Sequence, residues 1–396
     1  MIPRMTTIGT LKNYRYNLNQ SNYTMGKAME VVTTRRLFSS YAEAPSVATH
    51  CFQIRRSYWR AESQYSVNES LCHKYDVAWS ALDSVSTDLY SRADDASVAS
   101  IIRAATGSTG PGRLALGQSL QAKAQDIAQI MNGRYSENYV FAGADTLNPP
   151  FTWGPQVNPD YDSTAANPVG KYLTEDGSPT DDADKAAKGL YYRGVAVDSN
   201  DPKDVEKMEY FLNGERKDLD LGLGHKEDGG EAVSSTVFDS ALQGLYYLGG
   251  YGTKDGVKVR GDDNEIIGTV DDIPNNVISI VNEMGQILRR CDEKTGDWAN
   301  DDDKLRFQAL FQEFESSNSS FRERWTEMDT QSSFLKGNGE LLQTTKDSLQ
   351  QQYMDLEDAD PAAAISDFMF ARYCYDTALK VGNSVLSQSL MDYMNL

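Results

Sequence analysis

One apolar seam in the first quarter of the chain constrains the fold more than any other feature. Its members recur alternately four and three residues apart, which is the spacing of a coiled-coil stripe. They are Val47, Cys51, Ile54, Tyr58, Ala61, Tyr65, Asn68, Cys72, Tyr75, Trp79, Leu82, Ser86 and Leu89. A second column, Leu71, Ala78 and Val85, lies beside the seam, so this helix needs partners on more than one side.

The length of the helix indicates a rod. A helix from Val47 to Ile102 would reach roughly 80 Å at about 1.5 Å per residue. We expect the rod core to contain Ile54, Tyr58, Tyr65, Asn68, Tyr75, Trp79, Leu82 and Leu89. Asn68 is polar, and two interpretations of it stay open: an amide that fixes the helix register, or a ligand contact, which no neighbouring residue supports.

Length and net charge bound the class of protein. The chain has 396 residues, 40% of them hydrophobic, which allows roughly two to four domains with real cores. A formal charge of −20 argues against nucleic acid, whose phosphates it would repel. No stretch is apolar enough to span a membrane, and residues 1–13 lack a signal-peptide core, which disfavours Sec-type export. Export by a route that reads an unfolded amino terminus stays open.

The charge is distributed unevenly along the chain. Residues 1–60 carry nine Lys or Arg against Glu30 and Glu43, a balance of +7, whereas residues 341–396 carry three basic and eight acidic residues, a balance of −5. The two ends are therefore electrostatically complementary. This suits terminal segments that pack on each other in one molecule or between neighbours.

The four cysteines do not form the pattern of a disulfide framework in so long a chain. Cys51 and Cys72 would lie about 30 Å apart on one straight helix, so they cannot bridge there. We expect all four to be small buried apolar residues.

Proline, glycine and polar turn residues divide the helical ends of the chain into segments. Residues 1–44 form an amino-terminal assembly helix closed by a polar joint, and Pro45 starts the rod because its fixed φ suits a first turn. Residues 45–138 form the amino-terminal part of the rod, with a glycine-rich reversal at 107–112. The inner face of the helix that follows consists of Leu116, Leu120, Ala124, Ile127 and Met131.

A region of different composition separates these helices from those at the carboxyl end. Residues 139–272 are rich in aromatic, Gly, Pro and Asp residues, with short alternating runs such as Leu190 to Val197 and Val257 to Val259. This predicts a central β-rich domain with a helical patch at 233–248. Residues 273–358 form the carboxyl-terminal part of the rod, and residues 359–396 an assembly helix capped by Asp360 with Pro361 in its first turn. The fold class is therefore mainly α, a long coiled-coil-like helical bundle around a β-rich insert.

Motifs for chemistry are missing from the sequence. The three histidines, His50, His73 and His225, stand in no H-E-x-x-H run, and no G-x-S-x-G elbow is present. Residues 262–265 and 249–255 are acidic or glycine-rich turns that lack the spacing of a calcium loop, and residues 107–112 lack the Lys that a phosphate loop needs. We therefore expect no enzyme activity, no cofactor and no metal site.

The terminal stripes are the candidate interaction sites. Two helices alone bury too little apolar surface to be stable, so we expect identical neighbours to complete them in coupled folding and assembly. The expected interface residues of the first helix are Leu11, Tyr14, Leu18, Met25, Met29 and Val32. Those of the last helix are Ile365, Phe368, Tyr375, Leu379, Leu386, Leu390 and Tyr393.

Several motifs resemble a known family. The strongest is the run Tyr139-Val140-Phe141-Ala142-Gly143-Ala144-Asp145-Thr146, preceded by Asn132-Gly133-Arg134-Tyr135 and followed by Pro150-Phe151. Further matches are residues 33–37, 43–45, 191–194, 237–238, 356–360, 375–379 and the ending Ser389-Leu390-Met391-Asp392-Tyr393. Together they resemble the bacterial flagellin family, and within it the hook-filament junction proteins, also called the third hook-associated proteins.

The resemblance implies an extracellular structural role in the bacterial flagellum. It implies export in an unfolded state by the flagellar type III apparatus with an export chaperone, and assembly of a ring between the hook-side hook-associated protein and the flagellin filament. The implied partners are flagellin, the hook-side protein, the chaperone and copies of the chain itself, with neither nucleic acid nor membrane. Two alternatives stay open: a divergent flagellin that forms the filament, and an enzyme or calcium-dependent module grafted as residues 150–270.

Overall fold

A computed structural model gives the fold of the chain. It describes residues 7–38, 40, 42–91, 96–107, 112–165, 170–224, 226–228, 231–260, 265–292 and 294–394. The chain divides into two compact units. We call Met1–Tyr65 with Glu340–Leu396 the terminal unit and Ser66–Gly339 the central unit.

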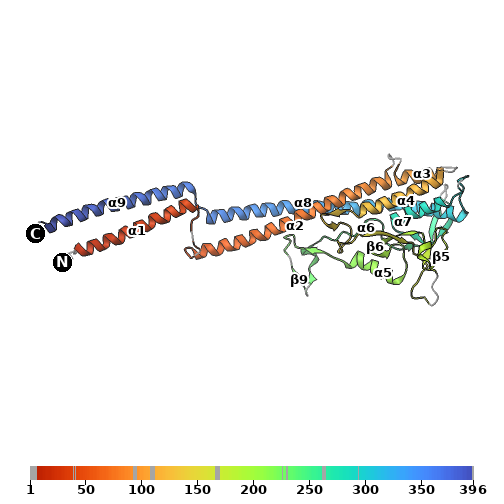
Figure 1. Cartoon of the computed structure of the whole chain (residues 1–396), viewed down its shortest axis with the longest axis horizontal. Coiled ribbons are helices and arrows are strands. Elements are labelled where there is room, and N and C mark those ends of the chain that lie inside the picture. The colour runs from red at the N-terminus through yellow and green to blue at the C-terminus, as the bar shows by residue number, and fades with distance from the viewer. Residues whose placement is uncertain are drawn as a thin grey trace. The chain divides into compact units, whose positions relative to one another are not determined.

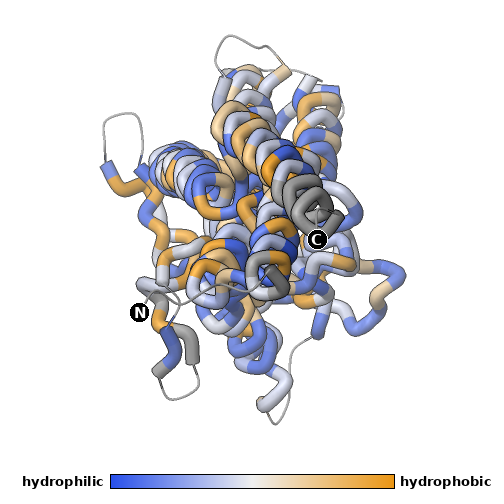
Figure 2. The backbone as a smooth tube through the Cα atoms, turned by 90° about the vertical axis from the view of Figure 1, so that its left-hand side faces the viewer, coloured by the Kyte–Doolittle hydropathy of each residue, from blue (hydrophilic) through white to orange (hydrophobic). Residues whose placement is uncertain are grey.

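The described residues of the terminal unit form helices joined by a short segment with one β-bridge, Arg36 with Asp358. Helix α1 (Thr7–Thr34) and helix α9 (Pro361–Met394) lie side by side and run in opposite directions (Figure 1). Two long helices, α2 (Pro45–Tyr90) and α8 (Asp301–Glu357), each contribute one end to this unit. Figure 2 shows apolar and polar residues mixed along the helical coils of the chain, and a helix with one buried face carries both kinds.

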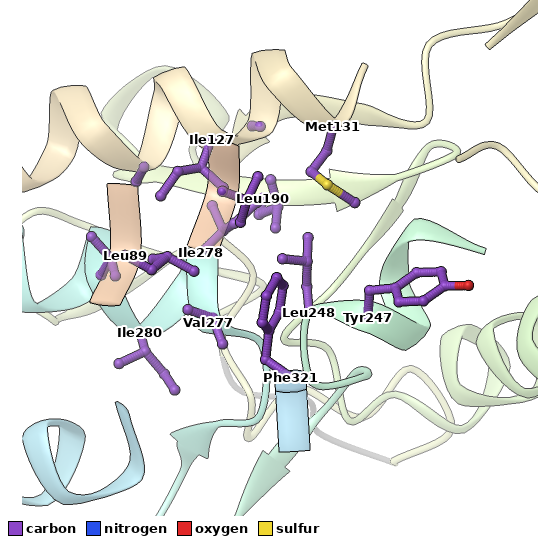
Figure 3. Packing of buried hydrophobic residues seen from close by; sticks show 14 of the residues in the cluster. Leu89, Ile127, Met131, Leu190, Tyr247, Leu248, Val277, Ile278, Ile280 and Phe321 are labelled. Atoms are coloured by element: carbon purple, nitrogen blue, oxygen red, sulfur yellow. The ribbon is translucent and has the colours of Figure 1, made fainter. Parts of the chain in front are cut away.

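The central unit has one hydrophobic core surrounded by helices and short strands. Its helices are the remaining parts of α2 and α8 together with α3 (Val98–Gly107), α4 (Gly112–Met131) and α7 (Val277–Arg289). Leu89 of α2, Ile127 and Met131 of α4, and Ile278 of α7 meet in this core (Figure 3). The predicted second column, Leu71, Ala78 and Val85, is fully or almost fully buried, which confirms that α2 is covered on more than one side.

Helices α4 and α7 cross at two glycines. A Cβ atom on Gly117 would lie 2.8 Å from the Gly285 carbonyl oxygen, and one on Gly285 would lie 2.9 Å from the Gly117 carbonyl oxygen. Real Cβ atoms do not approach backbone so closely, so the crossing requires glycine in both helices.

The strands form one three-stranded sheet and several two-stranded ribbons, all antiparallel. In the larger sheet β6 (Lys188–Tyr192) lies between β3 (Phe151–Pro155) and β7 (Val195–Ala196). The ribbons pair β1 (Arg134–Tyr135) with β2 (Asn138–Tyr139), β4 (Tyr172–Leu173) with β5 (Pro179–Thr180), β8 (Asp218–Leu219) with β11 (Phe238–Asp239), β9 (Glu227–Asp228) with β10 (Glu231–Ala232), β12 (Thr253–Lys254) with β15 (Ile273–Pro274), and β13 (Val257–Arg260) with β14 (Ile266–Val270). The strands expected at 190–197 and 257–259 are thus confirmed, and the chain is mainly α with a β component.

The helices inside the insert are short. They are α5 (Pro202–Glu209), α6 (Gly244–Tyr247), a π-helical turn at Tyr210–Gly214 and 3-10 turns at Ala183–Lys185 and Ser234–Thr236. The helical patch expected at 233–248 is therefore wrong over most of its length. Val237 is extended and Phe238 pairs with Leu219, so strand pairing with a distant segment overrides the local helical periodicity.

Helix α2 is shorter than predicted. It ends at Tyr90, and α3 begins anew at Val98 instead of continuing to Ile102 in one helix. Ser97 explains the restart because its hydroxyl accepts a hydrogen bond from the Ser100 amide at 3.3 Å, while its carbonyl accepts one from Ile101. Val98 and Ile102 are both buried, so apolar periodicity resumes after the interruption. The reversal expected at 107–112 falls largely on residues 108–111, outside the described residues.

Candidate assembly surface

The two ends of the chain meet at a joint inside the terminal unit. Helix α1 ends at Thr34, and Arg35 then takes a left-handed φ of 58°. The Leu37 amide donates to the Glu357 carbonyl at 2.9 Å, and the Ala359 amide donates to the Arg35 carbonyl at 2.9 Å. The segments 33–37 and 356–360, which both carry the family resemblance, thus form one antiparallel backbone pairing.

A buried carboxylate fixes this joint electrostatically. The Glu357 side chain is only 2% exposed, and its oxygens lie 3.2 Å from Arg36 and 3.3 Å from Arg55. Arg55 also hydrogen-bonds the Tyr353 hydroxyl and lies over the Tyr353 ring, 4.9 Å from its centroid. The basic amino-terminal segment therefore neutralises an acid of the carboxyl-terminal segment within one molecule.

The start of helix α9 is the one that the sequence predicts. Pro361 is its first residue, and the Asp360 carboxylate accepts a hydrogen bond from the Ala362 amide at 2.8 Å. The cap fixes where the carboxyl-terminal helix leaves the joint.

The predicted interface residues of α1 and α9 whose side chains the structure describes divide into two groups. Met29, Ile365 and Leu379 are exposed. The half-buried group consists of Leu11, Tyr14, Leu18, Met25, Val32, Phe368 and Tyr375. The side chains of Leu386, Leu390 and Tyr393 lie outside the described part of the chain, although the backbone there continues α9.

Further exposed apolar residues on these helices were missed by the sequence prediction. Met369, Phe370 and Tyr373 of α9 are 66%, 69% and 68% exposed. The others are Tyr16, Tyr23 and Val381. A signal for part of this set was available, because Ile365, Met369 and Tyr373 recur every four residues and so form a second helical stripe.

Between α1 and α9 runs a mostly apolar groove of about 600 Å³. Ala28 and Val31 of α1 and Ala371 and Phe370 of α9 line it. Further along the pair, the Tyr14 ring occupies the space that a Cβ atom on Gly382 would need, so the two helices approach each other closely there. Gly382 therefore allows α1 and α9 to approach each other closely there, and the groove leaves open space between them elsewhere.

The rod-core residues of α2 are not uniformly buried. Asn68, Tyr75, Leu82 and Leu89 are buried, whereas Ile54, Tyr58 and Tyr65 are half-buried. Trp79 differs from the prediction, since it is 41% exposed. It covers Trp325 of α8 with 5.6 Å between ring centroids, and an indole can present one face to a neighbour and the other to water.

The Asn68 amide is satisfied by protein groups. Its nitrogen donates to the Leu335 carbonyl at 2.9 Å, and its oxygen accepts from Asn338 at 3.1 Å. Asn338 in turn donates to the Leu221 carbonyl at 3.1 Å. These bonds match the interpretation of an amide that fixes the register of two packed helices.

The aromatic run at 139–143 is tied to other segments of the insert. The Phe141 carbonyl accepts a hydrogen bond from the Tyr192 hydroxyl at 3.0 Å, and the Gly143 amide donates to Leu242 at 3.0 Å with a left-handed φ of 67°. Arg193 pairs at 2.7 Å with Glu215, whose carboxylate also accepts from the Ala144 amide at 3.2 Å. The segments 139–146 and 191–194, both part of the resemblance, thus meet in one structural cluster.

The described residues contain no cluster suited to metal binding, since no three His, Cys, Asp or Glu side chains converge there. His50 and His73 are exposed, and His225 lies outside the described residues. No helix in the described part of the chain is both long enough and apolar enough to cross a bilayer.

All four cysteines are free thiols. Cys51 and Cys291 are buried and Cys72 is half-buried, and desolvation raises the pKa of each of these three thiols. Cys374 departs from the expectation of burial, because its side chain is exposed and lines the groove between α1 and α9.

No family model matches the chain, and no curated protein matches it either. Among the solved structures that resemble it are flagellar hook-associated proteins. One, described as a flagellar hook-associated protein of Vibrio parahaemolyticus, is 12% identical, covers 80% of this chain and 100% of its own, and has a TM-score of 0.48. FlgL of Xanthomonas campestris is 11% identical, covers 76% of this chain and 99% of its own, with a TM-score of 0.43. The flagellar hook-associated protein 3 of Legionella pneumophila is 11% identical, covers 80% and 98%, with a TM-score of 0.41.

Proposed function

We propose that this chain is a structural protein of the bacterial flagellum, an adapter ring at the hook-filament junction. In this role it joins the hook-side hook-associated protein to flagellin, after export through the flagellar type III apparatus with a chaperone. The five segments 1–44, 45–138, 139–272, 273–358 and 359–396 are the proposed assembly helix, rod, insert, rod and assembly helix. The motif resemblance names the family, and the architecture of the terminal unit supports the role.

The observation that carries the proposal is the exposed apolar surface of α9. Met369, Phe370 and Tyr373 are each about two-thirds exposed on a helix whose described partner is α1. A pair of helices without a further layer leaves apolar faces in water, and contiguous apolar faces of this kind mark interaction sites. In the proposed ring, neighbouring subunits cover them, and the two long helices carry torque as a coiled-coil rod.

Deletion of the gene tests the role. The expected result is cells with hooks but without filaments, which shed flagellin into the medium. Retained filaments would contradict the junction role. If the purified chain instead polymerised alone into long filaments, the alternative of a divergent flagellin would replace it.

A pair of variants tests the surface. Phe370→Gln combined with Tyr373→Gln should fail to restore filaments in the deletion strain, because it removes apolar contact area without altering buried residues. Leu147→Gln is the matched control, since Leu147 is exposed to a similar degree but lies in the central unit. Equal complementation by both variants would refute the assignment of the surface to α9.

A further inference from the structure

Two ion pairs join helices α2 and α8 in the terminal unit. Arg55 of α2 lies 3.3 Å from the Glu357 carboxylate of α8, and further along α2 the Glu62 carboxylate lies 3.1 Å from Lys346. Residue numbers therefore fall along α8 as they rise along α2, so the helices are antiparallel. The two ion pairs also fix which positions of α2 and α8 lie at the same height.

Helix α2 carries a basic and aromatic stripe, which we call the α2 stripe. Phe52, Arg56 and Trp59 are spaced four and three residues apart, so they share one helical face, and all three are exposed. Arg60 is exposed beside them. Among the described residues, neither Arg56 nor Arg60 forms an ion pair. The α2 stripe therefore combines positive charge with exposed apolar area.

Helix α8 carries an acidic counterpart, which we call the α8 stripe. Glu340, Asp347 and Asp355 are all exposed and are spaced at about two helical turns, so they share one face. Asp347 and Asp355 accept hydrogen bonds from glutamines of their own helix at 2.9 and 2.8 Å, which leave the negative charges uncompensated. Leu341 and Met354 are exposed along the edges of this stripe. The α8 stripe therefore combines negative charge with exposed apolar area.

The charges of the two stripes lie at matching heights. Counted from the first ion pair, Arg56 is within about one residue of the height of Asp355, which is about 1.5 Å along the helix axis. Counted from the second ion pair, Arg60 is equally close to the height of Asp347. Copies related by rotation about an axis parallel to these helices keep the same heights. A neighbouring copy would therefore bring each arginine opposite an aspartate.

We propose that the α2 stripe of one copy docks on the α8 stripe of the next copy, with Arg56 opposite Asp355 and Arg60 opposite Asp347. The two stripes differ, so the interface is heterologous, and such contacts form a ring when the rotation between copies closes. Opposite charges set the register between copies, and the exposed apolar residues add contact area. This contact rests on the proposed function, because it requires copies that stand side by side at one height.

Two charge reversals test the contact in the purified whole chain. Arg56→Asp and Asp355→Arg each place like charges across it, so each variant should show a lower average mass than the unaltered chain in light scattering at low ionic strength. Arg56→Asp makes the chain more acidic and Asp355→Arg makes it less acidic, so a loss in both cannot come from net charge. Arg103→Asp, the same charge change at an exposed position of the central unit, should keep the mass of the unaltered chain.

A mixture of the two variants shows whether the contact joins different copies. Each altered stripe then meets a complementary stripe on the other variant, so the average mass should rise above that of either variant alone. A contact within one molecule would instead give the mixture the mean of the two separate masses. That mean, or an equal loss of mass in Arg103→Asp, would overturn the inference, as would variants that associate as the unaltered chain does. Arg60→Asp with Asp347→Arg is the substitute pair if either variant does not fold.

The same variants separate this contact from the junction role in cells. In the deletion strain, either variant alone should leave hooks without filaments, whereas expression of both together should restore filaments. Filaments with either variant alone, or no filaments with both, would overturn the contact between the stripes. Filaments in the deletion strain itself would overturn the junction role, and light scattering of the purified variants would then decide the contact.

Discussion

Replacing Gly285 with alanine should destabilise the central unit, although the same change elsewhere in a helix usually stabilises a protein. Gly285 lies where α7 crosses α4. The added Cβ atom would lie 2.7 Å from Cγ of Gln121, 2.9 Å from the Gly117 carbonyl oxygen and 3.1 Å from the Gln121 amide nitrogen. Two of these three atoms belong to the backbone, so a side-chain rotation cannot make room and the helices must separate.

The size of the effect follows from two opposing contributions. Alanine in a helix gains about 0.4 to 1 kcal/mol over glycine by restricting the unfolded chain, whereas overpacking a well-packed core costs about 1 to 3 kcal/mol. We therefore expect a net loss of about 1 to 2 kcal/mol for Gly285→Ala. Gly337→Ala supplies the control, because Gly337 lies in helix α8 with no atom within 4 Å of its Cβ position. It should gain about 0.4 to 1 kcal/mol.

Guanidinium unfolding followed by tryptophan fluorescence measures both variants. Trp79, Trp153, Trp298 and Trp325 lie in the central unit and only Trp59 lies outside it, so the signal reports mainly on the altered region. The denaturant midpoints should move in opposite directions with an unchanged m value. If Gly285→Ala stabilised the protein as much as Gly337→Ala does, the close crossing of α4 and α7 would be refuted.

Three further predictions concern the joint, the buried acid and the chain ends. Arg55→Ala should lower the free energy of unfolding by about 1 to 3 kcal/mol, because it leaves the Glu357 carboxylate with one cation fewer. Arg56→Ala, at the neighbouring exposed position, should change it by under about 0.5 kcal/mol. Hydrogen exchange at residues 340–360 would measure both variants, and equal protection would contradict the role of Glu357. Folding raises the pKa of Asp198 from 3.8 to about 7, so the folded state holds an extra proton between these pH values. The free energy of unfolding should therefore fall as pH rises from 4 to 7, by on the order of 4 kcal/mol relative to Asp198→Asn. A constant difference between the two proteins in pH-dependent unfolding would contradict this. Removing residues 1–40 or 365–396 should leave a soluble folded monomer that no longer assembles, and loss of helical circular dichroism throughout the chain would be the opposite result.

Local sequence patterns predicted the elements that depend mainly on residues close together in the chain. The seam and second column of α2, the cap at Asp360 and the strands at 190–197 depend on periodicity, capping and turn residues, which are properties of short windows. The break after Tyr90 escaped prediction because apolar residues resume at Val98 with helical spacing, so the interruption rests on one capping serine.

Long-range packing decided the features that the sequence could not show. Helix α7 is buried on every side, and its polar residues serve contacts with distant segments: Asn282 donates to the Lys188 carbonyl at 2.9 Å, and Gln286 to Gln156 at 3.0 Å. A single sequence shows these residues as a solvated face. The burial of the Asp198 carboxyl, which raises its pKa, likewise becomes visible only in the folded structure.

The exposure of the candidate surface differs from the predicted stripe, and its role in assembly stays a prediction. The stripe through Leu18 and Phe368 partly packs within the α1–α9 pair, whereas the most exposed apolar side chains, such as Phe370 and Tyr373, lie beside that stripe. Periodicity identifies the face that packs first, and that face is taken by the neighbouring helix of the same chain. In the proposed ring, the second stripe is the one that a neighbouring subunit would cover.

The charges at the two ends support the same distinction between contacts within one molecule and contacts between neighbours. Opposite charges at the chain ends suited contacts within one molecule or between neighbours, and at Glu357 the arginines that pair with it belong to the same chain. Apolar side chains also remain uncovered on α9, including Met369 and Phe370. Ion pairs have strict geometry and weaken with salt, whereas apolar contact is less directional. The ion pairs would therefore set the direction in which α1 and α9 leave the joint, and the exposed apolar residues would supply the affinity between neighbouring subunits in the proposed ring.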